Sequence, residues 1–312
     1  MPRFILLALA GLAGQLIDGA LGMAFGLTST TVLLTVGVAP AVASASTHLA
    51  EVGTTLASGI SHCAFGNIEW SKIGWLAIPG AVAAFAGATL LTSLPAEAAA
   101  PVVAVILFGL GVYILARFAF LRSDAVRVRR IPRRMLVPLA AVAGFMDAVG
   151  GGGWGPIGSS TLLASGRMEP RKVVGTMAAA EFLVALGASA GFLVGLTASE
   201  IPFRIVAALL VGGVVAAPLA AWVVRLLPAR LMGTLVGGII LLTNARTFIG
   251  AVGLDQQAAW PLYAALAAVW IGAVVAVVRA LRRGRADVAQ QAADDAVGAA
   301  PEPQPADAVT VR

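Results

Sequence analysis

Four acidic side chains stand inside long apolar stretches of the sequence. They are Asp18, Glu51, Asp147 and Glu181. A charged side chain at the centre of a bilayer costs roughly 2.5–3.5 kcal/mol on insertion scales, so such residues face a cavity, pair with another group or carry a proton. Two interpretations stay open. The acids line a pathway for a solute or for protons, or they accept hydrogen bonds from the free backbone N–H groups of interrupted helices.

A histidine accompanies one of these acids. His48 and Glu51 are one helical turn apart and can interact, and Ser44 and Thr47 fall on or near the same face. Histidine titrates near neutral pH, so the pair could exchange protons. The alternative is a buried polar pair that stabilises helix packing. The matching position in the second half of the chain is Ala178, so a proton role would be asymmetric.

Glycine clusters followed by hydroxyl side chains form a second candidate site. Glycine interrupts helices, and the N-terminus of the next helix presents free N–H groups and a partial positive charge. Two such ends that meet near the midplane would bind an anion, although the glycines could instead serve close helix packing. Trp154 would either gate this site or fill it as an apolar plug. The predicted substrate-binding residues are Thr30, Thr31, Gly152, Gly153, Trp154, Ser159, Ser160 and Thr161.

The composition indicates what kind of element must position these residues. Of 312 residues, 59% are hydrophobic and 12% are charged, against about 25% charged in a soluble domain, and the mean hydropathy is +0.94. Long apolar runs recur along the chain, which predicts an all-α polytopic membrane protein, because helices satisfy their own backbone hydrogen bonds in lipid. The arginines lie mostly in short loops, which indicates membrane orientation rather than a nucleic-acid partner.

Several classes of site are excluded by what the sequence lacks. A single cysteine, Cys63, cannot form an internal disulfide, and two histidines argue against an all-protein zinc site. The sequence contains no metal-binding loop, nucleophile elbow or ATP-binding motif. We therefore expect no metal, no cofactor and no enzymatic activity.

The chain contains an internal repeat. Residues 1–120 and 135–252 are predicted to be two copies of one membrane unit, joined by an arginine-rich linker at 121–134. An extra transmembrane helix at 253–281 and a disordered polar tail at 282–312 are predicted to follow. The matched residues include Asp18 with Asp147, Ser29 with Ser159, Thr31 with Thr161 and Glu51 with Glu181.

The first segment of each repeat sets the topology. Segments 4–36 and 135–165 are too long for one ordinary span and contain the glycine clusters. We interpret each as a broken helical hairpin that leaves the membrane on the side it entered, because this arrangement gathers nearly all loop arginines on one side. Each repeat then adds three spanning helices, so the two repeats are inverted. The linker and the tail are predicted to be cytoplasmic, with the chain multi-pass in the cell inner membrane.

The sequence resembles the sulfite exporter TauE/SafE family, also called the toluene sulfonate uptake permease family. The resemblance covers about residues 4–252 and rests on the duplicated unit, on the run 147–156 and on the polar stretches 46–51 and 66–70. It implies a membrane transporter for sulfite, sulfonates or related small anions. The family, and not the spacing of residues, supplies this substrate class.

The function predicted from the residues and the resemblance is secondary transport of a small anion by alternating access, with proton coupling left open. A pseudo-symmetric duplication suits alternating access better than it suits an active site. An anion channel and, less favoured, an intramembrane enzyme remain as alternatives. The expected partners are the anionic solute and the lipid bilayer, and whether the chain forms a homodimer is left open.

Overall fold

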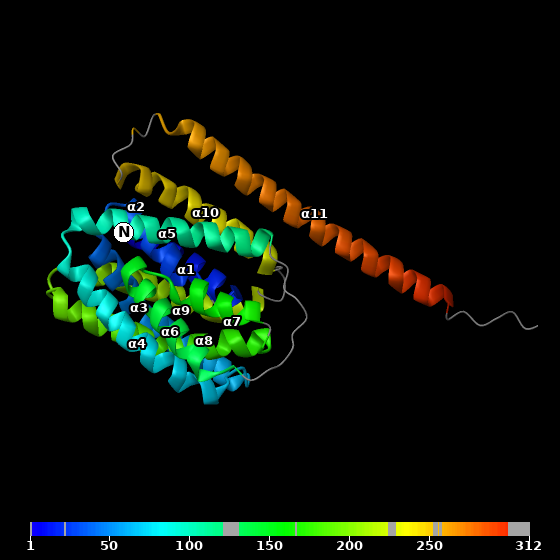
Figure 1. Ribbon diagram of the computed structural model, residues 1–312, viewed down its shortest axis with the longest axis horizontal. Helices are drawn as coiled ribbons and strands as arrows, with labels where there is room; N and C mark the ends of the chain where they lie inside the picture. The colour runs from blue at the N-terminus through cyan, green and yellow to red at the C-terminus, as the bar shows by residue number, and fades with distance from the viewer. Residues whose placement is uncertain are drawn as a thin grey trace, which may run out of the picture.

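The computed structural model is a bundle of helices from which the last helix projects (Figure 1). It describes residues 2–21, 23–120, 131–165, 167–223, 229–251, 255 and 258–298, and this part of the chain contains no strand. In chain order the elements are α1 (Pro2–Leu21), α2 (Phe25–Thr35), α3 (Pro40–Ala64), α4 (Trp70–Ser93), α5 (Ala96–Ala119), α6 (Arg133–Gly150), the π-helical turn η1 (Trp154–Ser159), α7 (Ser160–Ser165), α8 (Pro170–Gly195), α9 (Phe203–Val223), α10 (Ala229–Ala251) and α11 (Trp260–Gly298).

Five helices in the described part of the chain are long and apolar enough to cross a membrane. A crossing needs about 20 apolar residues, because a helix rises about 1.5 Å per residue and the hydrocarbon core is about 30 Å thick. The five candidate spans are Trp70–Ser93, Ala96–Ala119, Arg171–Gly195, Gly233–Gly250 and Trp260–Arg283. The prediction of an all-α polytopic membrane protein is therefore confirmed.

Helix α3 is as long as these spans but carries the polar face that the sequence predicted. Ser44, Thr47, His48 and Glu51 are all buried on it. Pro40 begins the helix, where its missing N–H and fixed φ cost nothing. The helix packs against α8 and α9, so its polar side chains face protein instead of lipid.

The first segment of each predicted repeat, 4–36 and 135–165, is interrupted where the glycine clusters predicted a break. Helix α1 stops before α2, and Ala24 between them has a left-handed φ of 115°. Helix α6 ends at Gly150, and the next residue, Gly151, has a φ of 70°, which favours glycine because glycine lacks a Cβ. The turn η1 then starts at Trp154.

Helices from one half of the chain pack chiefly against helices from the other half. Helix α4 packs against α6 and α8, α1 against α9, and α5 against α10. Small residues permit close contact between these backbones. A Cβ at Gly144 would collide with the backbone of Gly80, and one at Gly111 would lie 2.8 Å from the nitrogen of Leu241. The pairing of α4 with α6 and of α9 with α1 fits the predicted repeat, whose inverted orientation stays a prediction.

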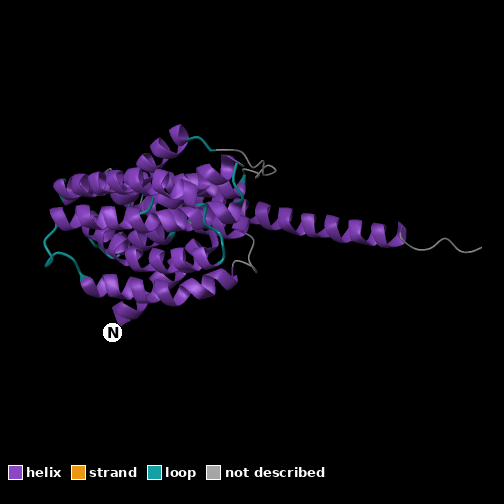
Figure 2. Cartoon of the chain, turned by 90° about the horizontal axis from the view of Figure 1, so that it is seen from below, coloured by secondary structure: helices purple, strands orange, loops and turns teal. Residues whose placement is uncertain are grey.

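Helix α11 lies along α10 and then extends past the bundle (Figures 1 and 2). The indole Nε1 of Trp270 donates a hydrogen bond of 3.1 Å to the carbonyl of Thr234 on α10. Because α11 continues to Gly298, residues 282–298 are helical where the sequence predicted disorder. Alanine, arginine and glutamine are frequent there, and all three favour helix.

Two predicted boundaries fall partly outside the described residues. The remainder of the predicted tail, 299–312, lies outside them, as does most of the predicted linker, 121–130. The end of that linker, Arg133 and Arg134, already forms the first turn of α6.

Candidate functional site

The centre of the bundle holds three buried ionisable groups, His48, Glu51 and Asp147, which we call the charged cluster. The Nε2 atom of His48 on α3 lies 3.2 Å from Oδ2 of Asp147 on α6 and 3.8 Å from Oε2 of Glu51. The other ring nitrogen, Nδ1, lies 2.8 Å from the carbonyl of Ser44. Both ring nitrogens thus face acceptors, an arrangement that suits an imidazolium donating from both sides. The sequence predicted the pair on α3, and the fold adds Asp147 from the second half of the chain.

Asp147 also holds the break between α6 and η1 in place. Its Oδ1 atom accepts hydrogen bonds from the backbone N–H groups of Gly153, at 2.6 Å, and Trp154, at 2.9 Å. These N–H groups begin η1 and have no partner within the turn itself. One carboxylate therefore joins the interrupted helix to His48.

Asp18 has the matching position at the break between α1 and α2. Its carboxyl is buried and accepts a hydrogen bond from the backbone N–H of Phe25, the first residue of α2. For these two acids the geometry favours the capping interpretation. The N-termini of both half-helices, at α2 and η1, are thus hydrogen-bonded to carboxylates of the chain itself, which reduces the positive field left for a bound anion.

The two interrupted segments meet backbone to backbone. A Cβ at Gly26 would lie 2.7 Å from the carbonyl oxygen of Gly151 and 2.9 Å from the Cα of Gly152. Across this contact the hydroxyl of Thr30 donates to the carbonyl of Gly151 at 2.9 Å. The hydroxyl oxygen of Thr47 lies 3.1 Å from the hydroxyl oxygen of Thr30. Glycine is required here because any side chain would separate the two breaks.

The predicted acid Glu51 keeps one oxygen without a hydrogen bond. Its Oε2 has no hydrogen-bond partner among the described residues, and its side chain is almost wholly buried. Glu181 on α8 is half-buried and within electrostatic reach of Asp18, Glu51 and Asp147. Four carboxyl groups and one imidazole therefore share a small volume, so they cannot all be charged without a large energetic cost.

The other predicted hydroxyl residues contact different neighbours. Ser159 and Ser160 are buried, and the hydroxyl of Ser160 lies 3.5 Å from the sulfur of Met23 in the first break. Thr161 is half-buried. Thr31 accepts a hydrogen bond of 3.0 Å from the side-chain amide of Asn244 on α10. Gly152 and Gly153 thus adjoin the charged cluster through Asp147, and Thr30 contacts Gly151 and Thr47 beside it, whereas the hydroxyl of Ser160 faces the first break.

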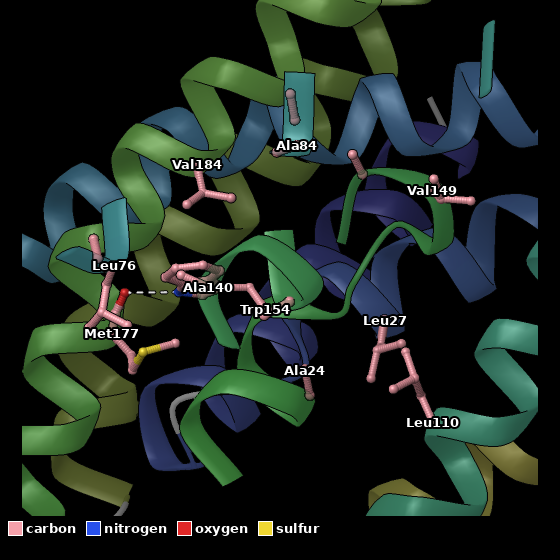
Figure 3. Close-up of a cluster of buried hydrophobic side chains, with 14 of the residues drawn as sticks. Ala24, Leu27, Leu76, Ala84, Leu110, Ala140, Val149, Trp154, Met177 and Val184 are labelled. Atoms are coloured by element: carbon pink, nitrogen blue, oxygen red, sulfur yellow. Dashed lines mark hydrogen bonds between the residues drawn. The ribbon is translucent and has the colours of Figure 1, made fainter. Parts of the chain in front are cut away.

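Trp154 fills the core beside the break. It is fully buried, and its indole Nε1 donates a hydrogen bond of 3.1 Å to the carbonyl of Met177 on α8 (Figure 3). Val184 and Leu76 lie around the ring in the same view. In this conformation Trp154 packs as an apolar plug, and its role as a gate stays a prediction.

Asn244 is a polar residue of the core that the sequence analysis missed. It is buried, it bridges Thr31 to α10, and its Oδ1 has no hydrogen-bond partner among the described residues. An amide in the middle of the predicted membrane segment 229–252 was the signal in the sequence. Because its Oδ1 is a free acceptor, Asn244 is a candidate residue for the lining of the solute pathway.

A metal ion is a second way to satisfy the charged cluster. One ligand atom from each of His48, Glu51 and Asp147 lies within 4.8 Å of the others, a spacing that a three-ligand site also uses. The direct contact between His48 and Asp147 satisfies the ring without an ion. The geometry therefore gives no reason to abandon the expectation of a metal-free site.

Interrupted helices that meet beside buried ionisable groups, within a bundle of membrane helices, are the plan of many membrane transporters. The family model described as "Sulfite exporter TauE/SafE" matches residues 6–247, so the chain belongs to this family. It is also 46% identical over 297 residues to "Probable membrane transporter protein YtnM" of Bacillus subtilis (strain 168), an alignment that covers 94% of this chain and 98% of that protein. No solved structure matches the chain.

These comparisons confirm the predicted family and identify a multi-pass membrane transporter. They point to a transporter rather than an enzyme. The matched range covers nearly all of both predicted repeats and ends before α11, whereas the alignment with the Bacillus subtilis protein covers 94% of this chain and therefore includes part of α11.

Proposed function

We propose that this transporter moves a small sulfur-containing anion, such as sulfite or a sulfonate, together with protons. The observation that carries the proposal is the contact between the two interrupted helices beside His48, Glu51 and Asp147. Asp18 and Asp147 occupy some of the backbone N–H groups at these breaks, and the remaining N–H groups together with the hydroxyls can replace the water around a small anion. The description of the matching family as sulfite exporters supports the substrate class.

Proton coupling follows from the charges around the site. Asp18, Asp147 and Glu51 would repel an anion strongly in a medium of low polarity if they were ionised. Protons on these carboxyls, or on His48, remove the repulsion. The anion and the proton are therefore bound in the same conformation and cross the membrane in the same direction.

Alternating access is the mechanism that best fits the packing. The two halves of the chain contact each other through glycine-lined helix pairs, which can slide or rock as rigid units. The break itself is closed in this conformation, because Leu27, Thr30 and Trp154 are fully buried. A carrier needs such a closed core, whereas an open channel does not.

The orientation belongs to the same proposal. We place the start of α4, the start of α6 and the connection between α7 and α8 in the cytoplasm, because they gather Lys72, Arg133, Arg134 and Arg167 at one end of the bundle. In a bacterial cell this membrane would be the inner one.

Transport into liposomes tests the proposal. The purified protein is reconstituted, and uptake of radiolabelled sulfite, thiosulfate and a small sulfonate is measured with and without a pH gradient. We expect saturable uptake that an inwardly directed proton gradient accelerates at least several-fold. The Glu51→Gln variant should lose that acceleration, because a neutral amide cannot release a proton.

Glu97→Gln is the matched control, since Glu97 is exposed in the first turn of α5. It should transport like the parent. Unaltered coupling in the Glu51→Gln variant would refute the proton role of this residue. Uptake that does not saturate would favour a channel, and absence of uptake for every anion would refute the substrate class.

A further inference from the structure

A second site lies at the end of the bundle, away from the charged cluster. A cavity of about 1010 Å³ opens between the start of α4, the start of α6 and the connection between α7 and α8. Its lining includes four basic side chains, Lys72, Arg133, Arg134 and Arg167, and no acidic side chain among the described residues. Three segments that are distant in the sequence thus contribute cations to one cavity.

Part of the cavity wall is apolar. The guanidinium of Arg133 lies 4.2 Å from the ring centre of Trp75, a cation–π contact that holds it over the cavity. Ile131 and Leu136 are buried in the same wall. A cavity with an apolar wall and several cations suits an amphiphilic ligand or a large anion better than it suits water alone.

The basic residues occupy unfavourable positions in their helices. Lys72 lies in the first turn of α4, and Arg133 and Arg134 form the first turn of α6, which contains no acidic residue. A helix N-terminus carries a partial positive charge, so cations there are repelled. An anion in the cavity would relieve both this repulsion and the mutual repulsion of the basic side chains.

Among the described residues, no ion pair neutralises any of the four basic side chains that line the cavity. The ion pair nearest to this region in sequence joins Arg171 to Glu169 and uses neither a lining residue nor the cavity. The carboxylate of Glu69 accepts a hydrogen bond of 3.0 Å from the hydroxyl of the lining residue Ser71. The positive-inside rule explains why cations lie at this end, but it does not explain why they converge on one cavity.

We propose that this cavity binds a phosphate group, supplied by the headgroup of an anionic lipid or by a soluble phosphate compound. Arginine recognises phosphate through paired N–H donors, and Arg134 and Arg167 offer such donors from two sides. Basic cavities between membrane helices on the cytoplasmic side bind anionic headgroups in this way. The site does not depend on the transported anion.

Binding to the purified full-length protein tests the proposal. The probes are phosphatidylglycerol and, for comparison, phosphatidylcholine, each added in detergent and followed by native mass spectrometry and thermal unfolding. We expect phosphatidylglycerol to stay bound and to raise the unfolding midpoint, while phosphatidylcholine does neither. The Arg134→Gln and Arg167→Gln variants should each weaken binding about fivefold, as expected for loss of one basic contact near a membrane surface.

Arg171→Gln is the matched control, because Arg171 is an exposed arginine in the first turn of α8 and does not line the cavity. It should bind phosphatidylglycerol like the parent. Millimolar inorganic phosphate that displaces the lipid assigns the site to soluble phosphates, and failure to displace it assigns the site to the lipid headgroup.

Two outcomes would overturn the proposal. Equal binding by the parent and both cavity variants would place the lipid elsewhere. Displacement by sulfite or thiosulfate, but not by phosphate, would make the cavity an entrance for the transported anion. Neither outcome depends on whether the liposome assay succeeds.

Discussion

At the scale of single residues, Asp147 connects the two features of the site. One of its oxygens holds two backbone N–H groups of the break, and the other contacts His48. A change in the protonation of either partner therefore acts on the backbone of the interrupted helix. This coupling gives a physical route from proton binding to a conformational change.

Removal of the Asp147 carboxylate should destabilise the protein. In the Asp147→Ala variant, His48 and the N–H groups of Gly153 and Trp154 lose their acceptor in a buried site. We expect a loss of about 3–5 kcal/mol in the free energy of unfolding, measured by thermal or denaturant unfolding in detergent. Asp147→Asn should lose less, because its amide oxygen still accepts both backbone hydrogen bonds.

The exposed Glu97→Gln variant again provides the control and should unfold like the parent. If Asp147→Ala were as stable as the parent, Asp147 would not be the cap of η1 that the geometry describes.

At the scale of the elements, the contact between the two breaks fixes the centre of the molecule. Gly26 lies against Gly151 and Gly152, and Thr30 bridges the contact with a hydrogen bond. Such contacts stabilise membrane helices through van der Waals packing and short hydrogen bonds, because lipid provides no hydrophobic driving force between helices.

A methyl group at this contact should disrupt it. In Gly152→Ala, the new Cβ would overlap the backbone nitrogen of Leu27, and the left-handed φ of 158° is unfavourable for alanine. We expect a lower unfolding midpoint and loss of transport. Gly74→Ala in α4 is the control, because a Cβ there meets nothing within 4 Å and alanine favours the helix.

The comparison of these two variants isolates the contact. A Gly152→Ala protein that unfolds and transports like the Gly74→Ala protein would mean that the two breaks separate readily, contrary to the tight packing.

At the scale of the whole molecule, one end of the bundle is basic. Lys72, Arg133, Arg134 and Arg167 meet there, and Lys172 donates a hydrogen bond of 3.3 Å to the carbonyl of Ile68. The C-terminus of α3 therefore lies on the same side of the bundle as the N-termini of α4 and α8. This arrangement is what the proposed orientation requires.

The single cysteine reports the orientation. Cys63 is exposed in the last turn of α3. We expect a membrane-impermeant maleimide to leave Cys63 unlabelled in intact cells and to label it in inverted membrane vesicles. In a Cys63→Ser protein, a cysteine introduced by Glu97→Cys should show the opposite pattern. Labelling of Cys63 from outside would reverse the proposed topology.

The sequence by itself determined the class of fold and the positions of the breaks. Apolar runs of about 20 residues predict spanning helices because backbone hydrogen bonds must be satisfied inside lipid, and the glycine clusters predict where α1 and α6 end. The sequence also singled out His48 and Glu51, because spacing along one helix is a local property. For residues 282–298 it predicted disorder from polar composition, whereas local helix propensity prevailed.

Only the tertiary structure decided how these parts combine. The contact of His48 with Asp147, the place of Asn244 beside Thr31 and the meeting of four basic side chains at one cavity join residues far apart in the chain. Such contacts depend on which helices pack together, and many packings satisfy the same apolar pattern. The backbone contact at Gly26 and Gly152 selects among them, because two interrupted helices can approach this closely only where neither carries a side chain.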